Sequence, residues 1–78
     1  MQVKILSPEK SIFEGEVHLV QVPGTNGSFE VLNNHAPIVS TLEKGKIKVI
    51  TSDGEVMYFD IEGGFVKVQN NVINVLID

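Results

Sequence analysis

The residues of this sequence that could perform chemistry are few and widely spaced. The two histidines, His18 and His35, have no histidine or cysteine partner at a spacing that holds a metal ion. Glu14 and Glu16 lie two residues apart on one face of a predicted strand, as a glycosidase pair would. Such a pair needs a shaped cleft, which a chain of 78 residues is too short to build. The serines lie in no nucleophile-elbow pattern. We therefore predict no catalytic residue, no metal site and no cofactor.

Two loops resemble functional motifs only superficially. Residues 23–27, with the sequence PGTNG, are glycine-rich but lack the lysine and the following helix of a phosphate-binding loop, so we predict a hairpin connection. His35 precedes Ala36 and Pro37, and the proline holds Ala36 extended. We interpret His35 as a turn residue that bonds to the backbone, with contact to a partner as the alternative.

Charge and composition exclude several classes of protein. The net charge is −4, and all of the basic residues are lysines, so the sequence has no electrostatic footprint for nucleic acid. Lys44, Lys46 and Lys48 alternate along one predicted strand and are expected to form its solvated face. There is no cysteine to form a disulfide. The length predicts a single domain, residues 1–78, with a small core that partners would help to stabilise.

The sequence predicts no direct membrane insertion. No apolar run approaches the roughly 18 residues that a membrane-spanning helix needs, and the first residues lack the long apolar segment of a secretory signal. We expect a cytoplasmic protein that reaches a membrane only through a protein partner.

The elements that must position any site are β-strands, because the apolar residues recur with a period of two. In residues 56–61, Met57, Phe59 and Ile61 share one face. Residues 72–77 carry Ile73, Val75 and Ile77 on one face. The predicted strands are residues 3–7, 12–22 with a bend at Gly15, 28–32, 38–41, 46–51, 55–61, 64–69 and 72–77.

Turn residues separate these strands. Asp53-Gly54 predicts a two-residue hairpin loop in which both central residues have positive φ, and Asn70-Asn71 is a weaker signal of the same kind. Gly63-Gly64 is interpreted as a bulge or a close approach between backbones. Short strands at this spacing predict an all-β sandwich or barrel.

Three segments resemble one family, the epsilon subunits of F-type ATP synthases. Residues 6–17 are similar to its opening strand and the bend that follows. Residues 22–39, VPGTNGSFEVLNNHAPIV, are similar to its signature PGxxGEFGVLPGHAPL. Residues 63–76 are similar to its closing GGFvev…nnvvtVLa. The three segments occur in the family's order and span nearly the whole chain.

The resemblance implies a fold and a role. The fold is a flattened β-sandwich or barrel of about eight to ten short, mostly antiparallel strands, the counterpart of the mitochondrial delta subunit. The role is that of a non-catalytic subunit in the central stalk, which bridges the gamma subunit and the c-ring and couples proton-driven rotation to ATP synthesis. It implies a peripheral location on the cytoplasmic side of the bacterial inner membrane.

The same resemblance implies two sets of contact residues. Ser28, Phe29 and Glu30 are the candidates for contact with the c-ring, and Ser7, His35 and Ala36 are those for contact with gamma.

The sequence also departs from the family pattern. Ser28 lies where the family often has glutamate, Glu30 where it has glycine, and Asn33-Asn34 where it has proline and glycine. Family members typically continue into a two-helix C-terminal domain that can inhibit ATP hydrolysis. We expect no such helical hairpin in these 78 residues, and no inhibition of that kind if they are the full length.

Two other classes remain as alternatives. A lipoyl- or biotinyl-carrier domain is a flattened β structure of similar size, but it displays a modifiable lysine at a hairpin tip, where this sequence has Asp53-Gly54. A ligand-binding barrel or a small enzyme would need a deep pocket lined by polar groups, of which the sequence gives no sign.

Overall fold

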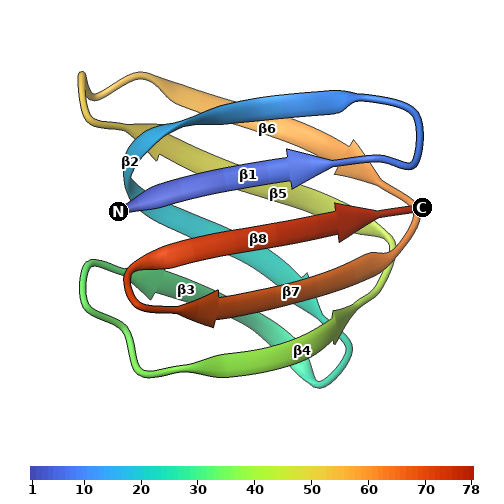
Figure 1. Ribbon diagram of the computed structural model, residues 1–78. Helices are drawn as coiled ribbons and strands as arrows, with labels where there is room; N and C mark the ends of the chain where they lie inside the picture. Colours follow the sequence, from blue (N-terminus) through green and yellow to red (C-terminus); the bar gives the residue numbers. More distant parts are fainter.

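The computed structural model describes all residues from 1 to 78 and contains eight β-strands and no helix (Figure 1). All of the predicted strands are present, and each lies within two residues of its expected bounds. They are β1 (Gln2–Leu6), β2 (Ser11–Gly24), β3 (Gly27–Leu32), β4 (Ile38–Leu42), β5 (Gly45–Thr51), β6 (Val56–Ile61), β7 (Gly64–Gln69) and β8 (Val72–Ile77).

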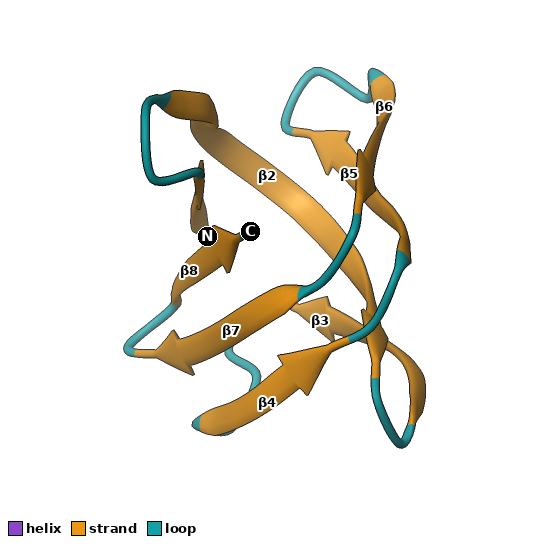
Figure 2. Ribbon diagram, turned by 90° about the vertical axis from the view of Figure 1, so that its right-hand side faces the viewer, coloured by secondary structure: helices purple, strands orange, loops and turns teal.

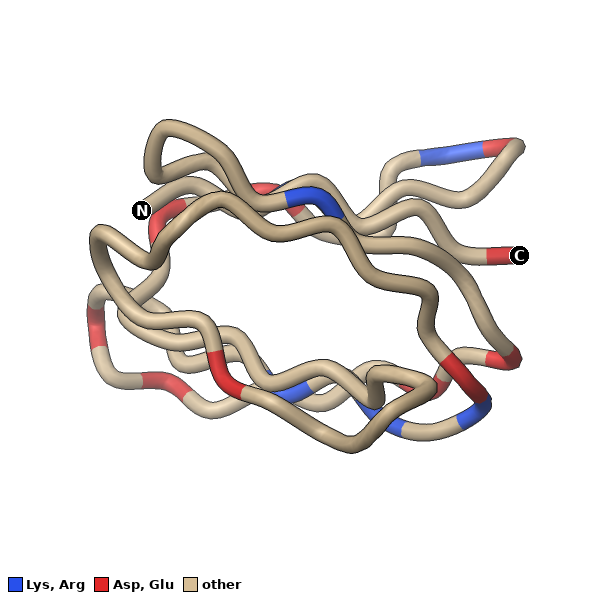
Figure 3. The backbone as a smooth tube through the Cα atoms, turned by 90° about the horizontal axis from the view of Figure 1, so that it is seen from below, with Lys and Arg blue, Asp and Glu red and all other residues tan.

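The strands form two packed layers, which gives the flattened sandwich that the sequence predicted (Figures 2 and 3). We call the layer of β1, β8, β7 and β4, with the first half of β2, the first layer. The second layer contains β6, β5, the second half of β2, and β3. Neighbouring strands are antiparallel except β1 and β8, which are parallel. The prediction of mostly antiparallel strands is confirmed.

The core between the layers is entirely apolar, and no polar or charged residue is buried. Alternation along each strand produces it, because every second side chain points inward. The aromatic rings of Phe13 and Phe59, 5.6 Å apart, close one side of the sandwich. Partly buried Phe29 and Ile38 pack on the core at the opposite side. The buried side chains are Met1, Val3, Ile5, Val17, Val20, Val22, Val31, Leu42, Ile47, Val49, Ile61, Val66, Val68, Ile73 and Val75.

Strand β2 belongs to both layers, but the bulge at which it passes between them is not at Gly15, where the sequence predicted a bend. Gly15 keeps regular pairing with Val3 of β1. The register shifts instead between Val17 and Leu19, so His18 is the bulged residue at which β2 passes from β1 to β5. A bulge adds a residue to one strand and increases its local twist, which redirects the strand without a glycine. The predicted bend at Gly15 was therefore misplaced by three residues.

The two asparagines of the β7–β8 turn form the predicted hairpin. Asn70 and Asn71 have φ values of 53° and 62°, and Gln69 pairs with Val72, so the loop has two residues. The prediction for Asp53-Gly54 was wrong in detail. Only Gly54 has a positive φ, of 88°, and its N–H donates to the Thr51 carbonyl at 2.9 Å. This is a three-residue loop with glycine in the left-handed position.

The Gly63-Gly64 pair allows a close approach between backbones, as predicted. A Cβ on Gly64 would collide with the Leu76 carbonyl of the neighbouring strand β8. A side chain is excluded here because the backbones of β7 and β8 leave no room for it.

Because the strands run lengthwise, all loops gather at two opposite ends of the sandwich (Figure 1). Met1 and the loops β3–β4, β5–β6 and β7–β8 lie at one end, which we call the Met1 end. Asp78 and the loops β1–β2, β2–β3, β4–β5 and β6–β7 lie at the other, the Asp78 end. The molecule measures 27 × 24 × 18 Å, so the two ends are separate surfaces.

Candidate interaction surfaces

The predicted c-ring residues lie on strand β3, at the edge of the second layer. Ser28 and Glu30 are exposed on its outer face, while Phe29 is partly buried against the core. Ser28 and Glu30 therefore lie on the side of the strand opposite Phe29. The Gln21 side chain on neighbouring β2 donates to the Ser28 hydroxyl at 3.2 Å. Glu30 is opposite Gln21 in the register and has no ion-pair partner within the chain, so its carboxylate is free to meet another molecule.

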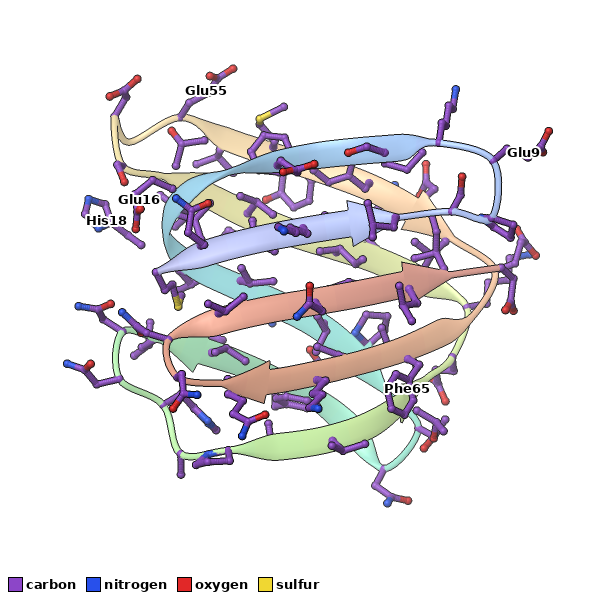
Figure 4. The ribbon with its side chains drawn as sticks, in the orientation of Figure 1. Glu9, Glu16, His18, Glu55 and Phe65 are labelled. Carbon is purple, nitrogen blue, oxygen red and sulfur yellow. The ribbon has the colours of Figure 1, made fainter.

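The predicted gamma residues fall at opposite ends of the molecule. Ser7 lies in the β1–β2 loop at the Asp78 end, where its N–H and hydroxyl both donate to the Lys10 carbonyl. His35 and Ala36 lie in the β3–β4 loop at the Met1 end. In Figure 4, Glu9 marks the first of these ends and Glu55 the second. A single partner must run along the sandwich to reach both.

His35 makes the backbone bonds of a turn residue. Its N–H donates to the Leu32 carbonyl at 3.1 Å, and its ring Nδ1–H donates to the Ala36 carbonyl at 2.7 Å. The other histidine, His18, is exposed and donates through Nε2–H to the Ser52 carbonyl at 3.1 Å. Each ring is bonded to a backbone carbonyl, and no cluster of metal-ligating side chains is present.

In the carboxylate pair Glu14 and Glu16, Glu16 is bound to the N-terminus of the chain and does not have the surroundings of a hydrolytic acid. The Glu16 Oε2 atom lies 2.6 Å from the α-amino nitrogen of Met1, and its Oε1 accepts a bond from Gln2 at 3.0 Å. The hydrogen bond from the α-ammonium group lowers the pKa of Glu16, and the charge of that group lowers it further. A general acid requires a raised pKa, so the direction of this shift opposes that role.

Two open hollows occur on the surface. The first, of about 440 Å³, separates the free edges of β3 and β4 and is lined by residues 26–29 and 38–40. The second, of about 290 Å³, lies beside it at residues 37–39 and 67–69. Both are open to solvent, whereas pockets for small molecules bury most of their ligand.

Apolar side chains on the outer face of the first layer form a surface that sequence reasoning missed. Register places Leu6 beside Leu76, and Leu76 beside Phe65, across three strands. Val39 of β4 is diagonal to Phe65, two pairs along the ladder and on the same face. Val39, Phe65 and Leu76 are 59%, 37% and 49% exposed. We call these four residues the first-layer patch, and Figure 4 shows Phe65 on this face.

A second set of exposed apolar residues crosses the outer face of the second layer. Val56 pairs with Ile50, Ile50 with Leu19, and Leu19 with Leu32, so one row spans four strands. Val56 and Leu32 are about half exposed, and the adjacent Tyr58 is 59% exposed. In the sequence, the apolar residues on both faces of residues 72–77, which form β8 of the first layer, indicated that an outer face could be apolar. Which apolar side chains lie next to one another on that face depends on which strands pair.

Comparison with known proteins places this sandwich in a family. The family model of the ATP synthase delta/epsilon chain β-sandwich domain matches residues 1–78. The ATP synthase epsilon chain of Protochlamydia amoebophila is 40% identical over 76 residues, which are 97% of this chain and 52% of that protein. That of Caulobacter vibrioides is 43% identical over 77 residues, 97% of this chain and 87% of that protein.

Solved structures share the fold at lower identity. A chain of the Euglena gracilis mitochondrial ATP synthase, from a structure of its OSCP, F1 and c-ring, superimposes with a TM-score of 0.89 and 23% identity over 96% of this chain and 48% of that one. A chain of the Tetrahymena thermophila mitochondrial ATP synthase, from a structure of its central stalk and c-ring, superimposes with a TM-score of 0.81. It is 22% identical, and the match covers 99% of this chain and 62% of that one.

The chain spans little more than half the length of several of these relatives, including 61% of the epsilon chain of Leptospira borgpetersenii, which is 38% identical. The match nevertheless covers every residue from Met1 to Asp78, and the observed all-β sandwich is the one that the family model describes. This chain therefore belongs to the ATP synthase delta/epsilon chain family, of which it contains the β-sandwich domain.

Proposed function

We propose that this chain is a non-catalytic rotor subunit in the central stalk of an F1Fo ATP synthase. It bridges the gamma subunit and the c-ring and couples proton-driven rotation to ATP synthesis. The observation that carries the proposal is the family match over all of residues 1–78. Exposed apolar side chains on both outer faces of a rigid sandwich also support it, because large exposed apolar groups mark surfaces that partners cover.

The first-layer patch is the proposed centre of the gamma contact. Leu6 precedes Ser7 directly, and strand β4 leads from Val39 toward Ala36 and His35 at the other end. A partner that lies along β4, β7 and β8 would therefore reach both sets of predicted gamma residues. Burial of apolar surface should supply most of the affinity, at about 25 cal/mol per Å² before the costs of association.

The outer face of β3 is the proposed c-ring contact. Ser28 and Glu30 lie on the layer opposite the first-layer patch, so the two partners would not compete for the same face. Exposed ion pairs contribute typically under about 1 kcal/mol. Glu30 would therefore adjust the register on polar loops of the ring more than it would increase affinity.

The proposed location is peripheral, on the cytoplasmic side of a bacterial inner membrane. The structure contains no helix of the length and hydrophobicity that crossing a membrane requires. Attachment through the c-ring is consistent with this finding.

A pair of matched charge substitutions tests which layer gamma covers. Phe65→Glu on the first layer should weaken binding to purified gamma at least tenfold, because it puts a charge into an apolar contact. Tyr58→Glu on the second layer, at an aromatic residue of greater exposure, should leave binding unchanged. Titration calorimetry of both variants decides the question. Loss of binding in the Tyr58 variant alone would mean that the two faces are exchanged.

A second comparison tests the individual contact residues. Glu30→Ala should leave gamma binding nearly unchanged, whereas Ala36→Glu should weaken it, because the new carboxylate would enter the gamma contact at the Met1 end. Both positions are exposed, so neither change should unfold the domain. The opposite result, with binding lost only for Glu30→Ala, would refute this assignment of contacts.

A further inference from the structure

The β2–β3 hairpin ends in a short loop, Thr25 and Asn26, to which the proposed function assigns no role. Gly24 pairs with Gly27, and the loop between them consists of Thr25 and Asn26 alone. Asn26 is exposed, and no other asparagine of the chain precedes a glycine. We propose that Asn26 is a site of spontaneous deamidation, at which this hairpin is converted over time to aspartyl and isoaspartyl forms.

The reaction needs only water and the backbone of the next residue. The backbone nitrogen of Gly27 loses its proton and attacks Cγ of Asn26, which forms a five-membered imide. The Cγ–Nδ2 bond breaks, and the amide group leaves with a proton as ammonia. Water then opens the imide at either carbonyl. One opening gives aspartate, and the other gives isoaspartate, in which the main chain runs through the former side chain.

The structure favours Asn26 over Asn33 and Asn71 for two reasons. Gly27 has no side chain to obstruct the ring, and the position that a Cβ would occupy there has no atom within 4 Å. The side chains of Asn33 and Asn71, by contrast, are held. The Asn71 Nδ2 donates to the Asn33 Oδ1 at 2.9 Å, and the Asn71 Oδ1 accepts a bond from the N–H of Asn34 at 2.8 Å.

The position in the fold also makes the required motion accessible. Gly24 and Gly27 are the last pair of the β2–β3 ladder, and terminal pairs open at low free-energy cost. Thr25 is held on β4, because its N–H donates to the Thr41 carbonyl at 3.1 Å and its hydroxyl lies 2.9 Å from that of Thr41, so the opening involves Asn26 and Gly27. Ring formation needs such a local opening and not the unfolding of the domain. The reaction should therefore proceed in the native protein under conditions in which the core stays folded.

The products would alter the surface next to Ser28 and Phe29. Either product adds one negative charge to a chain whose net charge is −4. Isoaspartate also lengthens the main chain of a two-residue loop by one carbon, which disturbs the pairing of Gly24 with Gly27. An effect of this change on c-ring binding rests on the proposed function, but the reaction itself does not.

The test is to age the folded protein in mildly alkaline buffer at physiological temperature. Ion-exchange chromatography would count acidic forms, and peptide mass mapping with an isoaspartate methyltransferase assay would locate them. We expect acidic forms to accumulate at Asn26 several-fold faster than at any other asparagine. Asn26→Gln, which keeps the amide but cannot form the five-membered imide, should abolish this accumulation.

The outcomes separate the reaction from its consequence. Equal rates in the wild type and Asn26→Gln, or faster reaction at any other asparagine (Asn33, Asn34, Asn70, Asn71 or Asn74), would overturn the proposal. Asn26→Glu carries the product charge without the imide chemistry, so its binding to a detergent-solubilised c-ring shows whether that charge affects the contact. Mapped deamidation without any change in c-ring binding would keep the proposed site and count against the proposed position of the ring.

Discussion

The α-amino nitrogen of Met1 lies 2.6 Å from the Oε2 atom of Glu16. This ion pair joins the N-terminus, directly before β1, to β2 at a position two residues before its bulge at His18. The Met1 amine also donates to the Val17 carbonyl and to the Asn33 Oδ1, each at 3.3 Å. Asn33 in turn accepts the bond from Asn71, so strand β2 and the β3–β4 and β7–β8 loops are connected through one ammonium group.

This ion pair predicts a dependence of stability on pH. The pKa of Glu16 is lowered from its ordinary value of 4.5 by the bond from the α-ammonium group. A carboxyl group whose folded pKa is depressed contributes stability above its unfolded pKa and loses it as the pH falls through its folded pKa. In a chain with a free Met1 amine, Glu16→Gln should therefore lower the urea midpoint at neutral pH.

The difference between the two proteins should shrink as the pH falls below 4.5 and disappear in stronger acid. Urea titrations of both proteins across this range check the prediction. Glu14→Gln is the matched control, because Glu14 lies on the same strand face, accepts a hydrogen bond from the Ser11 hydroxyl at 3.4 Å and forms no ion pair. A midpoint difference that stays constant with pH would show that Glu16 acts through packing instead of charge.

The Asn70-Asn71 turn should be sensitive to β-branched residues. Asn70 has a φ of 53° and an exposed side chain, and the left-handed conformation costs ordinary residues about 1–2 kcal/mol. Asn70→Val should therefore lower the free energy of unfolding by about that amount, while Asn70→Gly should leave it nearly unchanged. Equal urea midpoints for the two variants would contradict the role of φ.

The core should tolerate little loss of volume. Ile47 is fully buried between the layers, so Ile47→Ala should cost about 2–5 kcal/mol and Ile47→Val about 0.5–1.5 kcal/mol. The larger loss is a sizeable share of the roughly 5–15 kcal/mol that stabilises a typical domain. Thermal unfolding followed by circular dichroism measures both, and the exposed Val56→Ala serves as the control. An Ile47→Ala protein as stable as this control would contradict the observed packing.

The isolated chain should not hydrolyse ATP. Its carboxylates are exposed and scattered, its histidines bond to backbone carbonyls, and its hollows are open. Phosphate release by the purified domain should equal the rate in buffer. Activity that stays with the domain through successive purification steps, and that an inactivating change in the domain removes, would contradict this expectation.

Most strand positions could be predicted from the sequence because they depend on local chemistry. Alternation such as Met57, Phe59 and Ile61 indicates a strand with one buried face, whatever it pairs with. Asn70-Asn71 forms its turn because asparagine tolerates the left-handed conformation. The family match rests on the same kind of information, since residues 22–39 carry the family's pattern in order along the chain.

The tertiary structure alone decided how these strands combine. Asp53-Gly54 became a three-residue loop because the Thr51 hydroxyl accepts a bond from the Glu55 N–H and the Thr51 carbonyl accepts one from Gly54. The first-layer patch joins Leu6 to Leu76, from opposite ends of the chain, only because β1 pairs in parallel with β8. Local patterns show which face of a strand is apolar, but the neighbour of that strand is chosen by the packing of the whole core, which no short segment encodes.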